Sequence, residues 1–181
     1  MKIMLPHRKN LGIRTVFNML GPLLNPANVK RQLIGTYDLE TAKKMAYVLR
    51  QRGYLKACTV YSNDGFDELS PFAVNHIFEV SIDKPAVNSY RYQPQPCEQN
   101  DLRLIQGGDS ATNAQITLLV LKGKKGVPRD ATVLNAAFGL YVGGKVDTID
   151  NGIRYASELI DDGVALKKLH EFIEISRDMA N

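Results

Sequence analysis

Residues 32–62 read QLIGTYDLETAKKMAYVLRQRGYLKACTVYS, and this stretch decides the fold. It begins with a short apolar run at 32–37 and ends with another at 56–62, each of which has the length and composition of a buried strand. Between the two runs, apolar residues recur at helical spacing from Leu39 to Leu49. Asp38 is placed to cap this helix and Gly53 to end it. The order of strand, helix and strand is typical of an α/β fold with parallel strands.

The rest of the chain extends this pattern. Further strands are expected over 76–82 and 88–93, and a helix over 11–20 is expected to stop at Gly21-Pro22, because proline cannot continue the hydrogen-bond ladder. From residue 109 onward the pattern is helical, with predicted helices over 110–122, 129–142, 148–162 and 164–177. The sequence therefore predicts one α/β domain over residues 1–181, with three layers and a mostly parallel sheet flanked by helices.

Composition limits the class of protein. Hydrophobic residues make up 44% of the 181 residues and charged residues 23%, which is ordinary for a globular domain. No apolar run approaches the roughly 20 residues that span a bilayer, and the apolar part of the N-terminus is too short for a signal peptide. Cys58 and Cys97 are far apart and have no metal-ligand spacing. Two isolated thiols favour a reducing, cytoplasmic location over a disulfide framework.

The net charge of +4 is unevenly distributed. Up to Lys56 the only acidic residues are Asp38 and Glu40, so the first third is basic. Such a region could bind carboxylates, phosphates or nucleic acid. The alternative is a solvated helix face, which suits the four basic residues of the second predicted helix, Lys43, Lys44, Arg50 and Arg52.

Three carboxylates follow directly on the strand at 56–62. They are Asp64, Asp67 and Glu68, with Gly65 allowing a tight turn. In open α/β sheets ligands gather where the carboxyl ends of strands release loops, and Mg²⁺ takes oxygen ligands, often one or two carboxylates with water and phosphate. The pattern is consistent with a magnesium site, although the spacing alone favours a solvated turn with an acid that caps a helix.

Two further groups of residues could bind anions. Arg8 and Arg14 lie near the Gly21-Pro22 turn, where a planar guanidinium could hold an aromatic carboxylate through two parallel hydrogen bonds; surface ion pairs are the alternative. Residues 107–110, Gly-Gly-Asp-Ser, precede a predicted helix and indicate a helix start more than a phosphate loop. Asn135 lies within a predicted helix and is expected to make a structural contact.

Four stretches together resemble the anthranilate phosphoribosyltransferase family. They are LGIRTVFNMLGPLLNP at 11–26, DGFDELS at 64–70, PRDATVLNAA at 128–137 and LIDDG at 159–163. The motifs occur in family order and at family-like intervals over essentially the whole chain. The Phe-Asn-x-Leu-Gly-Pro-Leu-x-Asn-Pro run separates the chain from the related pyrimidine nucleoside phosphorylases.

The resemblance implies a function and a site. Members of the family transfer a phosphoribosyl group from phosphoribosyl pyrophosphate to the amino group of anthranilate in tryptophan biosynthesis, with Mg²⁺. By resemblance, Arg8 binds anthranilate, Gly21-Pro22 lines the acceptor channel, and Asp67 and Glu68 bind the metal. The implied fold is that of the nucleoside phosphorylase and phosphoribosyltransferase group.

The chain departs from the family at its start. Family members begin with a small helical domain, followed by a Gly-Thr-Gly-Gly-Asp loop that holds the pyrophosphate, and this chain contains neither. We therefore expect a truncated C-terminal α/β domain whose residues 1–25 contribute a helix toward the helical domain. The chain alone is expected to be inactive, and its full-length parent to be a homodimer. The alternative is a catalytically dead, nucleic-acid-binding relative that uses the basic first third.

Overall fold

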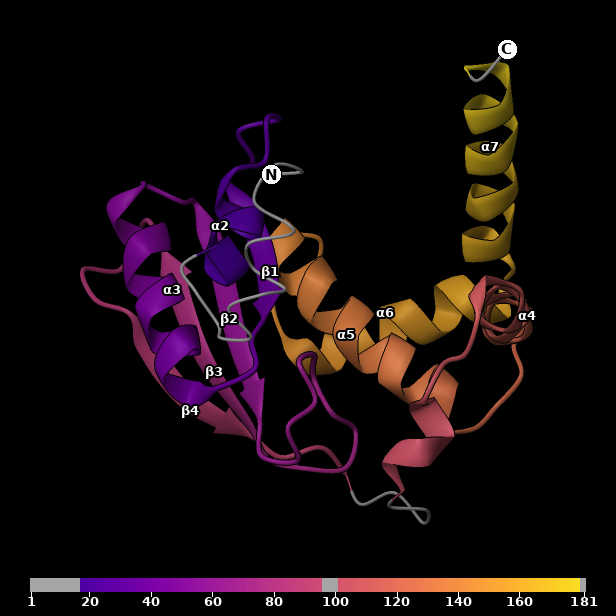
Figure 1. Ribbon diagram of the computed structural model, residues 1–181, viewed down its shortest axis with the longest axis horizontal. Coiled ribbons are helices and arrows are strands. Elements are labelled where there is room, and N and C mark those ends of the chain that lie inside the picture. The colour runs from indigo at the N-terminus through magenta and orange to yellow at the C-terminus, as the bar shows by residue number, and fades with distance from the viewer. Residues whose placement is uncertain (1–16, 96–100, 180–181) are drawn as a thin grey trace, which may run out of the picture.

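The structure of the protein is a computed structural model that describes residues 17–95 and 101–179 (Figure 1). Strands lie in the first half of the chain and helices dominate the second. In chain order the elements are α2 (Phe17–Leu23), β1 (Arg31–Gly35), α3 (Leu39–Gln51), β2 (Lys56–Ser62), β3 (Asn75–Ser81), β4 (Asn88–Tyr92), the 3-10 helix η2 (Leu102–Ile105), α4 (Ser110–Leu121), α5 (Val127–Gly143), α6 (Ile149–Asp161) and α7 (Val164–Asp178).

The four strands form one sheet in the order β1-β2-β3-β4. The β1–β2 pair is parallel, whereas β2–β3 and β3–β4 are antiparallel. The α/β class is confirmed, but the described sheet is mixed and not mostly parallel. Parallel neighbours need a long crossover connection, usually a helix. Between β1 and β2 this crossover is α3, whereas the connections at 63–74 and 82–87 contain no helix, so the chain turns back on itself.

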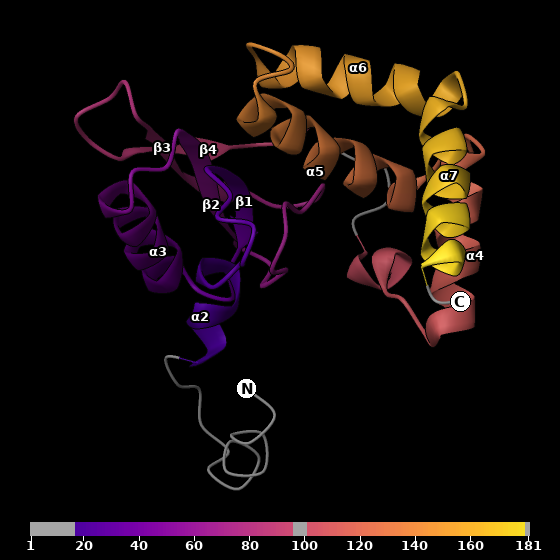
Figure 2. The ribbon, with the colours of Figure 1, turned by 90° about the horizontal axis from the view of Figure 1, so that it is seen from above.

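Helices cover both faces of the sheet, which gives the three predicted layers (Figure 2). Side chains alternate between the faces along each strand. On one face the strands pack with α3 in a buried cluster of Ile34, Met45, Ala46, Leu49, Tyr54, Ala57 and Val80. On the other they pack with α5 in a cluster of Cys58, Val60, Leu69, Ile77, Leu134, Phe138 and Val142. Each large, fully buried side chain of these clusters contributes roughly 1.5–3 kcal/mol to folding.

The predicted cap of α3 is confirmed. The Asp38 carboxylate accepts hydrogen bonds from the Thr41 N–H (2.8 Å) and from the Thr41 hydroxyl (2.7 Å). The stretch 107–110 also begins a helix as expected, since Asp109 caps α4 by accepting from the Thr112 N–H at 2.8 Å.

The predicted end of the first helix was wrong. Gly21 and Pro22 lie inside α2, which continues to Leu23. The proline ring has a φ that is compatible with a helix, and its missing N–H removes one hydrogen bond from this short helix, which ends one residue later. The Gln32 amide donates to the Pro22 carbonyl at 3.1 Å, so a neighbouring strand satisfies part of this helix end. Residues 11–16 of the predicted helix lie outside the described residues.

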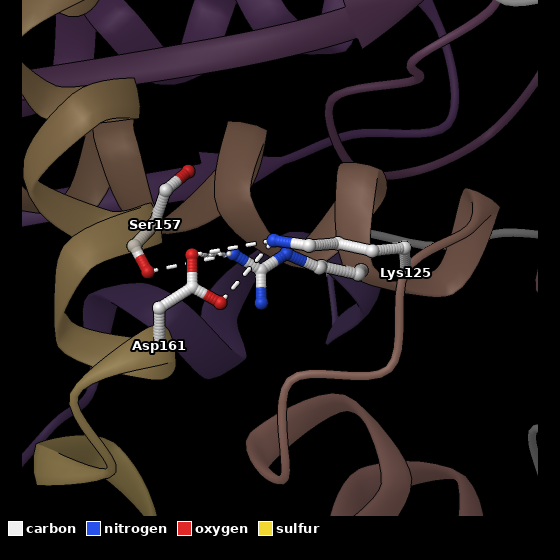
Figure 3. Close-up of polar contacts among 4 residues, drawn as sticks. Lys125, Ser157 and Asp161 are labelled. Atoms are coloured by element: carbon white, nitrogen blue, oxygen red, sulfur yellow. Dashed lines mark hydrogen bonds and ion pairs between the residues drawn. The ribbon is translucent and has the colours of Figure 1, made fainter.

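The second half of the chain adds helices beyond the sheet. Helix α6 crosses α5 closely at Gly152, where an added Cβ would lie 2.8 Å from the Ala137 carbonyl oxygen. A polar contact also joins the beginning of α5 to the end of α6. Arg129 Nη2 and Lys125 Nζ both lie within 3.2 Å of the Asp161 carboxylate (Figure 3). Helix α7 extends from the end of α6 and contains no buried residue (Figure 1).

Candidate functional site

The loop at 63–74 follows β2 and carries the predicted metal-binding residues. Asp64 organises its first turn by accepting hydrogen bonds from the Ser62 hydroxyl (2.7 Å), the Phe66 N–H (3.2 Å) and the Ser70 hydroxyl (2.5 Å). All of these partners belong to the loop or to the strand end before it. Asp64 therefore shapes the turn, which is the structural role that the sequence left open for it.

Two asparagines hold the second half of the loop. The buried Asn75 side chain bonds Ser70 in both directions, accepting from its N–H (2.8 Å) and donating to its carbonyl (2.9 Å). The Asn135 side chain, on α5, accepts a hydrogen bond from the Leu69 N–H (3.1 Å) and donates one to the Leu69 carbonyl (2.9 Å). The structural role expected for Asn135 is confirmed. Together the asparagines fix the backbone directly after Glu68.

Gly35 at the end of β1 lets the loop approach the sheet. A Cβ at this position would lie 1.6 Å from the Asp67 carbonyl oxygen, so only glycine can occupy it without a shift of the backbone. Sequence reasoning missed this residue. A glycine inside a predicted strand is the signal that could have found it, because it often marks a close approach of another backbone.

Asp67 and Glu68 are exposed on this anchored loop. Within residues 17–95 and 101–179 their carboxylates make no hydrogen bond or ion pair, so their oxygens are free to meet a cation. In the same part of the chain, no group of three or more His, Cys, Asp or Glu side chains is placed to hold a metal ion. Two carboxylates fit Mg²⁺, which commonly keeps several waters and bonds to substrate phosphate.

A cavity of about 450 Å³ opens beside Glu68. It lies between the 63–74 loop, the turn at 102–106 and the first half of α5, and its size suits a small molecule. Its lining is Phe66, Glu68, Leu104, Ile105, Gln106, Ile116, Pro128, Ala131, Thr132, Asn135 and Ala136. A smaller cavity of about 310 Å³ shares Phe66, Ile105 and Gln106 with it and adds Arg103. The loop therefore borders two cavities that share lining residues, with Glu68 at the first and Arg103 at the second.

Gly21 and Pro22, the predicted acceptor residues that the structure describes, lie elsewhere. Arg8 lies outside the described residues. Gly21 and Pro22 lie on α2, close to Gln32 at the start of β1, whereas Asp67 contacts Gly35 at the end of that strand. Gln32 and Gly35 are three positions apart along the strand, which is about 10 Å. Neither Gly21 nor Pro22 lines the cavity beside Glu68, so the described residues do not join the two parts of the predicted site.

The basic side chains of α3 behave as a solvated face. Lys43, Lys44 and Arg50 are exposed on the side of the helix that faces away from the sheet. Arg52, just after the helix, donates to the Leu23 carbonyl and so joins the ends of α2 and α3. The exposure of Lys43, Lys44 and Arg50 matches the solvated-face interpretation of the basic residues of this helix, and Arg52 departs from it through its bond to Leu23.

Two buried ionisable groups lie between the sheet and α5, away from the loop. Burial raises the pKa of the Cys58 thiol to about 12, so it stays protonated and unreactive at neutral pH. Glu79 on β3 accepts a hydrogen bond from the Tyr141 hydroxyl at 3.0 Å. Burial, followed by this hydrogen bond, raises the pKa of Tyr141 to about 12. Glu79 joins β3 to α5, a role that no local sequence pattern indicates. Cys97 lies outside the described residues.

Comparison with known proteins shows the family. The family model described as "Glycosyl transferase family, a/b domain" matches residues 1–166. The chain belongs to this glycosyl transferase family. Among its relatives, anthranilate phosphoribosyltransferase from Methanobrevibacter smithii is 43% identical over 179 residues, which cover 96% of this chain and 52% of the relative.

Solved structures of glycosyl transferase relatives agree with this assignment. Anthranilate phosphoribosyltransferase from Thermus thermophilus superposes with a TM-score of 0.87 at 32% identity, over 98% of this chain and 52% of that one. The enzyme from Saccharomyces cerevisiae in complex with PRPP and Mg superposes with a TM-score of 0.82 at 28% identity, over 94% of this chain and 50% of that one. The chain thus spans about half the length of the relatives that it matches.

These comparisons confirm the family resemblance and the α/β domain, and nothing in them favours the nucleic-acid-binding alternative. Among the described residues, none of the helices combines the length and the apolar character that crossing a membrane requires.

Proposed function

We propose that this chain supplies the magnesium-binding part of an anthranilate phosphoribosyltransferase. The observation that carries the proposal is the exposed Asp67–Glu68 pair, held on an anchored loop beside a cavity. The relatives are anthranilate phosphoribosyltransferases, which supports the proposed reaction. The yeast relative was solved in complex with PRPP and Mg, which supports the proposed donor and metal. A cytoplasmic location and a homodimeric parent belong to the same proposal.

The two carboxylates are suited to holding the metal in place. When bound, Mg²⁺ supplies positive charge that stabilises the departing pyrophosphate. The side chains of Asp67 and Glu68 would hold it at the carboxyl end of the parallel β1–β2 pair. Because Asn75 and Asn135 fix the backbone that follows, the loop needs little reordering when the ion binds, which favours binding.

The acceptor is proposed to bind through Arg8 and the Gly21-Pro22 segment. A guanidinium offers two parallel hydrogen bonds to the anthranilate carboxylate. In the reaction, the amine lone pair forms a C–N bond at the anomeric carbon while the C–O bond to pyrophosphate breaks, and the amine then releases a proton to solvent. The protein's main contribution is orientation of the amine against the sugar carbon. No strong general base is required.

Metal binding by the chain itself tests the central step. Mn²⁺ is titrated as a paramagnetic probe against the chain, and binding is read from water proton relaxation. We expect the double variant Asp67→Asn, Glu68→Gln to weaken binding at least about tenfold, because it removes both charged ligands. The control variant Glu40→Gln, Asp83→Asn changes the net charge equally at two other exposed acids. Equal affinities of the two variants would refute the metal assignment.

Activity tests the reaction. We expect the isolated chain to form no measurable phosphoribosyl anthranilate from anthranilate, phosphoribosyl pyrophosphate and Mg²⁺, because the chain spans only about half the length of its relatives. Product formation is followed by the loss of anthranilate fluorescence. Turnover at an ordinary enzymatic rate, which is about 1–10³ per second, would show that the chain carries a complete site.

A further inference from the structure

A small cavity with three basic side chains lies at the beginning of α5. Its volume is about 140 Å³, and it lies between α4, the connection at 122–126 and the first residues of α5. Its lining is Ile116, Leu119, Val120, Lys124, Lys125, Pro128 and Arg129. Ile116 and Pro128 also line the cavity beside Glu68, but neither Asp67 nor Glu68 lines the smaller one. The proposed function therefore leaves these basic side chains without a role.

Arg129 is buried in the wall of this cavity, and only one of its terminal nitrogens is bonded. Its side chain is 5% exposed. Nη2 donates to the Asp161 carboxylate at 2.8 Å and to the Ser157 carbonyl at 3.4 Å. Nη1 is also buried, and among the described residues it has no hydrogen-bond acceptor. Because an unpaired buried donor costs free energy, native proteins rarely keep one without a reason. Nη1 is therefore a donor to which an oxygen atom of a ligand can bond.

The first turn of α5 adds a backbone donor. Gly126 caps this helix of 17 residues without a side-chain hydrogen bond, and its second residue is Pro128. The N–H of the buried residue Val127 bonds no acceptor in the described part of the chain. The beginning of a helix carries partial positive charge, and free N–H groups there commonly bind phosphate. The helix start and Arg129 therefore favour the same kind of ligand.

The charges around the cavity also favour an anion. Lys125 Nζ lies 3.2 Å from the Asp161 carboxylate, which also pairs with Arg129. Lys124 is exposed and makes no ion pair within residues 17–95 and 101–179. Three cations therefore share one carboxylate, and the charge of Lys124 is available to a ligand.

A second cavity beside Arg129 is less suited to an anion. It has a volume of about 680 Å³ and lies on the side of α6. Asp130 and Asp150 both line it, and their carboxylates would repel a negative charge. An anion that bonds Arg129 is therefore expected in the smaller cavity, on the side of Lys124.

We propose that the smaller cavity binds a phosphate group, either inorganic phosphate or that of a small phosphomonoester. The Val127 N–H, Arg129 Nη1 and Lys124 Nζ donate to its oxygens, because a phosphate accepts several charge-assisted hydrogen bonds at once. The apolar side chains of Ile116 and Leu119 contact the substituent of an ester. A volume of about 140 Å³ is close to that of a cavity that holds benzene, so only a small substituent fits.

Amide NMR of the chain tests the site. Inorganic phosphate, phenyl phosphate and acetate are titrated separately, at constant ionic strength and without Mg²⁺, so the Asp67–Glu68 pair takes no part. We expect the amide resonances of Val127 and Arg129 to shift and saturate with phosphate, and acetate to bind at least about tenfold more weakly, because it has fewer oxygens and less charge. Tighter binding of phenyl phosphate than of inorganic phosphate would assign the site to esters. Equal or weaker binding would assign it to free phosphate.

A charge-matched pair of variants separates the cavity from a basic surface in general. Lys124→Gln removes a proposed donor, whereas Lys122→Gln removes the same charge from an exposed lysine that does not line the cavity. We expect Lys124→Gln to raise the Kd for phosphate at least about fivefold, because it removes a charged hydrogen bond. Lys122→Gln should raise it less than about twofold, because salt screens exposed charges that make no contact with the ligand.

A further variant tests the buried donor. Arg129→Lys keeps a cation for Asp161 but has no second terminal nitrogen, so we expect it to raise the Kd for phosphate at least about tenfold. Circular dichroism checks that this variant is folded. If it is not, the two lysine variants decide alone.

Three results would overturn the proposal. One is the absence of saturable shifts at the Val127 and Arg129 amides when phosphate is added. Another is an equal effect of Lys124→Gln and Lys122→Gln, which would show only a general attraction of phosphate to basic side chains. A third is acetate that binds as tightly as phosphate, which would mean that the cavity does not recognise a phosphate group.

Discussion

Helices α3 and α7 have similar length and different surroundings. Both alternate apolar and charged residues over 13 and 15 residues, respectively. Helix α3 buries Thr41, Ala42, Met45, Ala46 and Leu49 against the sheet, whereas α7 buries no residue and leaves Phe172 65% exposed. An amphipathic pattern thus predicts a helix without showing whether its apolar face is covered. The stability of this chain should therefore lie in the layers around the sheet.

The largest expected effect is on the α3 side of this comparison. Leu49 is fully buried between α3 and the sheet. Replacing it by alanine removes buried methyl groups and leaves a cavity, which costs about 3 kcal/mol in the free energy of unfolding. Urea denaturation followed by circular dichroism measures the change. A loss below about 1 kcal/mol would mean that the α3 layer is far less tightly packed than the structure shows.

A second test concerns the contact between the sheet and the site loop. We expect Gly35→Ala to cost about 2 kcal/mol, because its Cβ would meet the Asp67 carbonyl and force the backbones apart. The same variant should weaken Mn²⁺ binding at the displaced loop. Gly139→Ala is the matched control: it lies in α5 with no atom near its added Cβ, so it should gain up to about 1 kcal/mol from helix propensity. If both variants changed the free energy of unfolding equally, the close approach of Gly35 to the Asp67 carbonyl would be contradicted.

Local patterns predicted the strands and helices of this chain well. The strand from 56 to 62 and the helix cap at Asp38 agree with the structure, because both depend on neighbouring residues alone. The direction of β3 and β4 depends on the connections. The lack of a helical crossover after β2 was visible in the sequence and could have predicted antiparallel pairing.

The acidic residues of the candidate site could be found from the sequence, but the contacts that position them could not. The carboxylates of Asp67 and Glu68 could be found by their position after a strand. The contacts of Gly35 with Asp67 and of Asn135 with Leu69 could not, because each joins segments that are distant in sequence. The general effect of proline predicted a helix end before Gly21, whereas α2 includes Pro22 and ends one residue after it.

A smaller effect is expected where α5 meets α6. The hydrogen bond from Arg129, with a further contribution from Lys125, holds the pKa of Asp161 below its ordinary value of 3.8. A carboxyl with a lowered pKa stabilises the fold above its unfolded pKa and loses that contribution as the pH falls through the folded value. The stability difference between the parent chain and Asp161→Asn should therefore be present at pH 6 and shrink below about pH 4.

Urea unfolding of both proteins across this pH range measures the difference. Asp162→Asn is the control, because within the described residues the Asp162 side chain makes no ion pair. A pH-independent difference for Asp161→Asn would show that the contact with Arg129 does not form in solution.

The smallest effect is expected on α7, and it sharpens the comparison with α3 most. Phe172→Ala removes a larger side chain than Leu49→Ala does. We nevertheless expect Phe172→Ala to change the free energy of unfolding of the chain by no more than about 0.5 kcal/mol, as for other exposed positions. Alanine also has the higher helix propensity, which offsets part of any lost contact. The measurement is the same urea denaturation. A loss above about 2 kcal/mol would mean that Phe172 is buried in solution, and that α7 packs where the structure leaves it open.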